Sequence, residues 1–155
     1  MTWWRTWRPR ACSKGTVDLS NLKHLGNPRD VVLLARVLIQ LVILKFRTER
    51  MKLPELLESL EPQGGVEADG REVEKMAKFA DFILHRVFRS RNPCLLRSLL
   101  LFRYLRASGE EVSIVFGVRD GEKTLQGHAW LLRGGKPLLE EEESSGEYEA
   151  VYVYP

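Results

Sequence analysis

The chain has 155 residues, 44% of them hydrophobic and 29% charged, and its formal net charge is +3. This length and balance are typical of one globular domain with a real core, and they exclude a disordered chain. The charge is too small to indicate nucleic acid as a partner. Two cysteines, Cys12 and Cys94, are too few for a disulfide framework, so we expect a reducing compartment, the cytoplasm.

Residues 1–26 differ in character from the rest and are expected to form a basic, Trp-rich arm. No apolar stretch follows the first arginines, so no signal peptide is predicted. Tryptophans mixed with arginines can bind a membrane surface or nucleic acid, but packing, or docking to a partner protein, is the interpretation we favour. Residues 27–155 are expected to form a single domain, helical over 27–108 and built of strands over 110–155.

Helical periodicity governs the first half of this domain. A helix over residues 27–50 is predicted from Asn27, a good N-cap, and Pro28, a good first helical residue. A short helix over 53–60 follows. Residues 61–70 contain a proline and three glycines and are predicted to be a loop. A third helix is expected over 71–88 from its apolar spacing.

Residues 31–46 are apolar enough to raise the question of a membrane. The stretch is shorter than a typical span and contains Arg36, Gln40 and Lys45, spaced four and five residues apart. We expect a buried amphipathic helix with these three polar residues near one face. A helix lying on a membrane surface is the alternative, so membrane-surface contact stays possible.

The helix predicted over residues 93–108 begins with the chemically most informative residue. Asn92 is a good N-cap and Pro93 a good first residue, so Cys94 falls in the first turn. The positive end of the helix dipole lowers the pKa of a thiol there and favours the nucleophilic thiolate. The helix carries apolar side chains on nearly all of its sides, which predicts that it is the central buried helix.

After Gly109 the pattern changes to strands. We expect them over residues 112–118, 124–133, 136–142 and 148–154, with turns at Asp120-Gly121 and Gly134-Gly135. Helices first and an antiparallel sheet afterwards make an α+β fold.

His128 lies in the second predicted strand, and an acidic stretch begins at Glu140. A helix-start Cys94, a strand histidine and a following carboxylate are the parts of a cysteine nucleophile with its base and its orienting acid. Trp130 shares the face of His128 and either shields the imidazole or simply packs. The sequence contains neither a Gly-rich phosphate loop nor Cys/His metal spacing, so no cofactor and no metal are expected.

The turn between the second and third strands decides which carboxylate faces His128. A three-residue loop that ends with Gly135 in a G1 bulge puts Glu140 opposite the histidine. A two-residue Gly134-Gly135 turn puts Glu141 there and turns Glu140 to the other face. The sequence leaves both registers open, and either supplies a carboxylate near the imidazole.

The same residues carry a resemblance to a known family. The helix start from Cys94 to Leu99, the Gly-Val-Arg segment at Gly117 and the His-Ala-Trp strand at His128 resemble the transglutaminase-like cysteine peptidases of lasso-peptide biosynthesis. In that family the acid follows twelve residues after the histidine, which here is Glu140, where the family usually has Asp. The resemblance covers about a third of the chain.

This resemblance implies a transglutaminase-like, papain-like core and a thiol protease that removes the leader from a ribosomally synthesised lasso-peptide precursor. Cys94 would be the nucleophile, His128 the base and Glu140 the orienting acid, with no cofactor in this chain. The implied partners are the precursor peptide, a separate leader-recognition protein and an ATP-consuming lasso cyclase. An acyltransferase with the same triad and a non-catalytic interaction module are the alternatives.

Overall fold

The structure is a computed structural model that describes residues 27–61, 70–89, 93–120, 125–139 and 146–155. The helices are α2 (Pro28–Arg50), α3 (Leu53–Leu60), α4 (Gly70–Phe82), a π-helical turn (Ile83–Val87) and α5 (Pro93–Ala107). The strands are β1 (Val112–Asp120), β2 (Leu125–Arg133), β3 (Lys136–Leu138) and β4 (Glu149–Tyr154).

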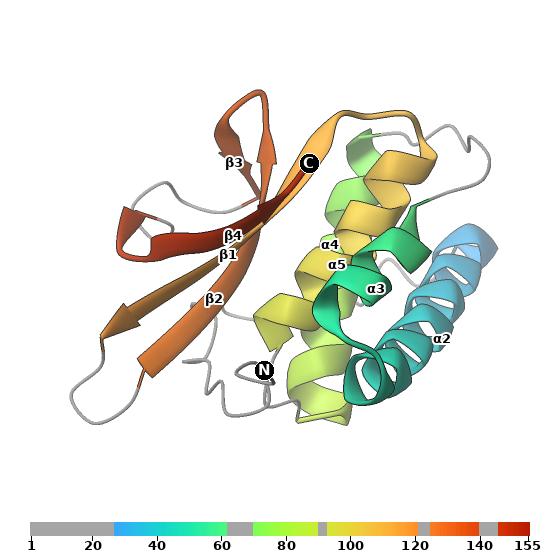
Figure 1. Cartoon of the computed structure of the whole chain (residues 1–155). Helices are drawn as coiled ribbons and strands as arrows, with labels where there is room; N and C mark the ends of the chain where they lie inside the picture. Colours follow the sequence, from blue (N-terminus) through green and yellow to red (C-terminus); the bar gives the residue numbers. More distant parts are fainter. Residues whose placement is uncertain (1–26, 62–69, 90–92, 121–124, 140–145) are drawn as a thin grey trace.

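The strands form one antiparallel sheet in the order β3-β2-β1-β4, and the helices lie together on one side of it (Figure 1). The predicted α+β fold is therefore confirmed. The predicted arm over residues 1–26 lies outside the described residues.

Local sequence accounts for the ends of the two longest helices. The Asn27 side chain accepts a hydrogen bond from the backbone N–H of Arg29 at 3.2 Å, which caps α2 as predicted. At the other end of the helical half, Gly109 has a φ of +80°, where a residue without Cβ is favoured. Its N–H bonds back to Arg106, and the N–H of Glu110 bonds to Leu105, so α5 stops where the sequence predicted.

The third helix differs from the prediction because its last part is π-helical. The N–H of Phe88 donates to the carbonyl of Ile83 at 2.9 Å, five residues back instead of four. Ile83 and Leu84 in this turn are buried, at 3% and 0% exposed, and join the core.

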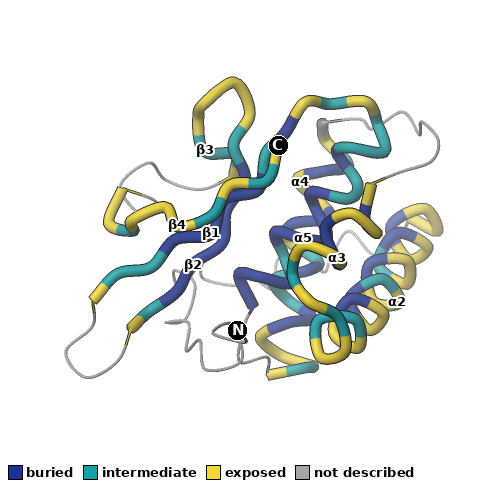
Figure 2. The backbone as a smooth tube through the Cα atoms, viewed as in Figure 1, coloured by how far each residue is buried: buried dark blue, intermediate teal, exposed yellow. Residues whose placement is uncertain are grey.

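Helix α5 is the centre of the molecule, as its apolar circumference predicted. It packs on β1 and β2 on one side and on α2 and α4 on the other (Figures 1 and 2). Alternation along the two central strands directs one set of side chains into this core: Ile114, Phe116, Ala129 and Leu131. By the same alternation His128 and Trp130 project from the other face of the sheet.

Helix α2 is not the buried amphipathic helix that the sequence predicted, because its outer face is exposed. It buries a narrow stripe whose members recur every three or four residues, and Figure 2 shows the exposed residues along its outer side. Arg36 and Lys45 are exposed and Gln40 is half-buried, but most of the outer face is apolar rather than polar. Helix α2 is outermost in the bundle, so nothing in the described part of the chain covers that face. None of the helices in the described ranges has the length and apolar character needed to cross a bilayer.

The hairpin between β2 and β3 has the two-residue turn. Arg133 pairs with Lys136, and Gly134 and Gly135 have φ values of +59° and +79°, as a type I′ turn requires. The three-residue loop is therefore wrong. Pairing with β2 extends only to Leu138 in the described residues, and Glu140 and Glu141 lie outside them. Strand β3 ends at Leu138, earlier than predicted, because Leu139 has a φ of +59° and leaves the extended conformation.

Candidate active site

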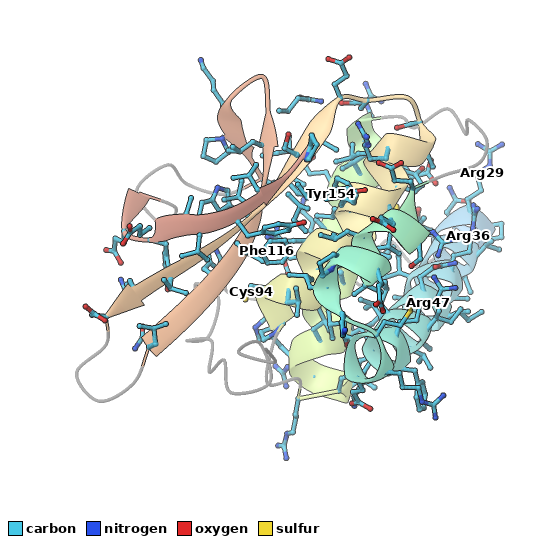
Figure 3. The ribbon with its side chains drawn as sticks, viewed as in Figure 1. Arg29, Arg36, Arg47, Cys94, Phe116 and Tyr154 are labelled. Carbon is cyan, nitrogen blue, oxygen red and sulfur yellow. The ribbon has the colours of Figure 1, made fainter. Side chains whose placement is uncertain are left out.

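Cys94 is the second residue of α5 and lies in its first turn, as predicted. Figure 3 shows it at the end of this helix, on the side toward the strands. The residue is only 1% exposed. First-turn backbone N–H groups have no partner within the helix, so they and the dipole favour a thiolate at this place. The predicted cap, Asn92, lies outside the described residues.

His128 on β2 contacts two aromatic rings. Its ring stacks on that of Trp130, with centroids 5.7 Å apart and planes inclined by 21°, and it contacts Tyr148 at 5.1 Å. His128 is 7% exposed and Trp130 is 5% exposed. Trp130 therefore both packs and covers the imidazole. Nothing in the local sequence linked Tyr148 to the histidine, because the two are far apart along the chain.

Gly117 makes the stacking of Trp130 possible. It pairs with His128 across β1 and β2. A Cβ added to Gly117 would lie 2.7 Å from two carbons of the Trp130 ring, closer than real atoms approach. The indole can therefore lie across β1 only if this residue is glycine.

The other residue of the Gly-Val-Arg segment that faces the same rings is Arg119. Its guanidinium lies over the Tyr148 ring, 5.0 Å from the centroid, and it forms an ion pair with Glu147. Arg119, Tyr148, His128 and Trp130 therefore form a continuous stack on the face of the sheet that points away from the helices. This stack restricts the rotation of the imidazole.

Two hydrogen bonds attach the first turns of α5 to the backbone beside the other candidate residues. The buried hydroxyl of Ser98 donates to the carbonyl of Ala129 at 2.8 Å, next to His128. The guanidinium of Arg97 donates to the carbonyl of Leu139 over a longer distance, 3.4 Å, and Leu139 directly precedes Glu140.

Arg97 is held from a second direction, because its Nε lies 3.2 Å from the Asp81 carboxylate at the end of α4. Arg97 and Ser98 follow Cys94 by three and four residues and therefore share its side of the helix. Neither residue was among the predicted site residues, since only contacts with residues distant in sequence reveal its role.

The Ser98 bond also relates the start of α5 to β2. Helix α5 and strand β2 run in the same direction in Figure 1. Cys94 precedes Ser98 by one helical turn, and His128 precedes Ala129 in the strand, so both candidate residues come before the bonded pair in their elements.

In the part of the chain that the structure describes, the edge of β2 that faces the start of α5 is bonded by Ser98 and not by β3. Among the described residues β3 pairs only with Leu131–Arg133, so the segment around Ala129 lies beyond the end of β3, and α5 bonds to it there. Because His128 projects from the face opposite the core, a contact with Cys94 has to be made around this edge.

The remaining candidates are placed only in part. Glu140 and Glu141 lie outside the described residues, so the orienting acid stays a prediction. Cys12 and His24 also lie outside them. His85 is exposed, and its Nδ1 lies 2.8 Å from the Asp81 carbonyl in its own helix, which fits an ordinary helix residue. In the described ranges no group of three or more His, Cys, Asp or Glu side chains could hold a metal ion.

In a comparison with protein families, residues 35–153 match the model of the transglutaminase-like superfamily. Searches of curated proteins and of solved structures give no match. The matched range contains Cys94, His128 and Glu140 and extends over most of the chain. Members of this superfamily usually act through a Cys-His-Asp triad, as cysteine proteases or acyltransferases. With its α+β architecture and a cysteine at the start of the central helix, the chain belongs to the transglutaminase-like superfamily.

Proposed function

We propose that this chain is a cysteine peptidase that removes the leader from a ribosomally synthesised lasso-peptide precursor in the cytoplasm. The observation that supports the proposal is the Ser98–Ala129 hydrogen bond, which joins α5, one turn after Cys94, to the residue that follows His128. The superfamily fits a cysteine peptidase or an acyltransferase. The motif resemblance at Cys94, Gly117 and His128 supplies the substrate class.

In the proposed reaction the Cys94 sulfur attacks the carbonyl carbon of the bond between leader and core. His128 accepts the thiol proton, and the backbone N–H of Cys94 stabilises the oxyanion. The C–N bond then breaks, and His128 returns the proton to the leaving amine of the core. Water, deprotonated by His128, next attacks the thioester, which releases the leader with a free carboxylate and restores the thiol. Glu140 would keep the imidazole in the required tautomer.

The proposal includes three partners. The precursor peptide is the substrate, a separate leader-recognition protein presents it, and an ATP-consuming lasso cyclase uses the released core. In this arrangement the recognition protein binds the leader away from the cut bond, and that binding energy positions the scissile carbonyl at Cys94.

The test is mass spectrometry of a precursor encoded beside this chain, incubated with the full-length protein and the leader-recognition protein. We expect a single cut between leader and core, which Cys94→Ala and His128→Ala each abolish, because members of such a unit act together. Cys12→Ala is the matched control and should cut like the parent protein. Cleavage by a folded Cys94→Ala variant near the parent rate would end the peptidase assignment.

The same experiment separates the alternatives. With an added amine, an acyltransferase would yield a leader whose mass contains the amine in place of the water-derived hydroxyl, whereas a peptidase yields the free acid. A non-catalytic module would give no product with any precursor, and its Cys94 would titrate as an ordinary buried thiol.

A further inference from the structure

The outer face of α2 exposes an apolar strip that the proposed peptidase reaction does not use. Seven large side chains are between 36% and 59% exposed: Val31, Val32, Leu38, Ile39, Val42, Ile43 and Phe46. At about 100° per residue they cover an arc of roughly 140°, and residues 31–46 extend over about 22 Å. We call these seven residues the apolar strip. Isolated exposed apolar residues are ordinary, but a continuous strip of this size marks an interaction surface.

Basic residues border the apolar strip. Arg29, Arg36 and Arg47 fall along one flank by helical spacing, and Figure 3 shows all three along α2. Arg50, in the last turn, falls within the arc of the strip itself. Lys45 lies on the opposite flank. The acidic side chain at the start of the helix is directed to the core side, where Asp30 pairs with Lys75 at 2.9 Å. The strip therefore presents an apolar centre with a cationic margin.

A hollow at the first turns of α2 continues this surface. It has a volume of about 590 Å³, and Val32 of the apolar strip forms part of its wall. Its charged lining contains four basic side chains and two acidic ones, and one of the acidic pair, Asp30, is already neutralised by Lys75. The basic ones are Arg29, Arg36, Arg71 and Lys75. A phosphate group would find an excess of positive charge there.

We propose that the apolar strip lies on an anionic lipid surface, with its arginine margin at the level of the phosphates. An apolar helix face bordered by Lys and Arg is the chemistry of interfacial helices, and here the protein core takes the place of the helix's polar face. The hollow beside Val32 would receive a lipid phosphate. No described helix can cross a bilayer, so the helix would lie flat on the surface.

Charge and sequence favour this occupant over a second copy of the chain. Two copies facing each other would bring basic margins together, which costs free energy, whereas anionic lipids neutralise them. A segment earlier in the sequence also combines apolar and basic residues, with three tryptophans and three arginines and no acidic residue over positions 3–10. Trp and Arg are the residues that membrane interfaces prefer.

Flotation of the full-length protein with lipid vesicles tests the proposal. We expect the protein to float with phosphatidylcholine vesicles that contain phosphatidylglycerol, and to stay behind with pure phosphatidylcholine vesicles. Raising the salt concentration should weaken the binding, because the arginines contribute through charge. Equal flotation with neutral and anionic vesicles, or none with either, would overturn the proposal.

Substitutions on the exposed face locate the contact without disturbing the core. Ile39→Glu and Phe46→Glu should each lower vesicle partitioning at least about tenfold, because each removes a large apolar group from the interface. Arg36→Gln should lower it about fivefold. The matched control is Val153→Glu on β4, which is 52% exposed against 58% for Ile39 and should bind like the parent. Circular dichroism checks that each variant is folded.

Three results would contradict the proposal. One is vesicle binding that Ile39→Glu leaves unchanged but that a Trp3, Trp4 and Trp7 to Ser variant abolishes, which would move the contact to the N-terminal segment. The second is a stable dimer in lipid-free solution that Ile39→Glu dissociates. The third is a loss of binding in Val153→Glu equal to that in Ile39→Glu. None of these tests depends on peptidase activity.

Discussion

The hydroxyl of Ser98 has a structural and a positioning role at once. It is buried, and it satisfies the Ala129 carbonyl next to His128 while it sits one turn from Cys94. Ser98→Ala should destabilise the protein by about 1–3 kcal/mol in urea unfolding, because a buried carbonyl loses its donor. It should also lower kcat for precursor cleavage more than it raises KM, because the bond that joins the Cys94 helix to the strand of His128 is lost.

Ser108→Ala is the matched control for this change. Its hydroxyl bonds to the Leu105 carbonyl at the far end of the same helix. A Ser98→Ala protein that cleaves the precursor as fast as Ser108→Ala would show that the Ser98–Ala129 bond does not position the site.

The second prediction for a single residue concerns Gly117. Gly117→Ala should destabilise the protein by about 1–3 kcal/mol, because its methyl group collides with the Trp130 ring and forces the indole off His128. Gly146→Ala adds the same methyl group where nothing lies within 4 Å and should be close to neutral. Urea unfolding, followed by tryptophan fluorescence, compares the two. Equal stabilities would contradict the tight packing of Trp130 against β1.

The sequence predicts individual site residues when their role depends on local position. Cys94 was predicted because a helix start is visible in the chain itself, and His128 because the strand pattern and the His-Ala-Trp motif are local. Ser98 and Tyr148 could not be predicted, since their importance comes from contacts with residues far away in the sequence. The same limit applies to the acid, because its position depends on how the chain continues after Leu139.

Among the elements, the ends of α2 and α5 and the approximate strand ranges follow from local signals, whereas the register did not. Both a two-residue and a three-residue loop satisfy the Gly134-Gly135 pattern, and only the left-handed φ of both glycines decides between them. The π-helical turn was also unpredictable, because the apolar run around Ile83 fits a regular helix until its packing is known. The outer face of α2 was misjudged because composition alone does not say which elements are outermost.

The contact between β4 and the end of α3 predicts that stability depends on pH. Burial raises the pKa of Tyr154 on β4, and the charge of Glu61 and the hydrogen bond to it, 3.3 Å long, raise it further. An unfolded tyrosine ionises near pH 10, so above that pH the unfolded state loses its proton before the folded state does. The stabilisation that Tyr154 gives to the folded state is therefore complete below about pH 10. It is lost as the pH rises through the higher pKa of Tyr154 in the folded state.

Tyr154→Phe should therefore flatten the fall in unfolding free energy above about pH 10. Urea unfolding from pH 8 to 11 compares the parent, Tyr154→Phe and Tyr152→Phe, the last being a control for loss of a hydroxyl on the same strand. Parallel curves for all three proteins would contradict the Tyr154–Glu61 contact.

For the whole molecule, the proposed reaction depends on a second protein. The described helices and strands are used to place Cys94 and His128, and we expect the chain alone to cleave a precursor slowly. A leader-recognition protein should raise the rate by supplying binding energy away from the cut bond. Initial rates over a range of precursor concentrations, with and without that protein, give the comparison. Equal cleavage rates with and without the leader-recognition protein at every precursor concentration would contradict its proposed role.

The central claim is that Cys94 and His128 work as one unit, and the ionisation of the thiol tests it without knowledge of the substrate. A Cys12→Ser protein has Cys94 as its single thiol, and thiolate absorbance at 240 nm follows its titration. We expect a pKa for Cys94 below the value of about 8.5 for a free cysteine, and a rise toward that value in Cys12→Ser/His128→Ala, because the imidazolium no longer stabilises the thiolate. A thiol that titrates at or above the free value, unchanged when His128 is removed, would contradict the account.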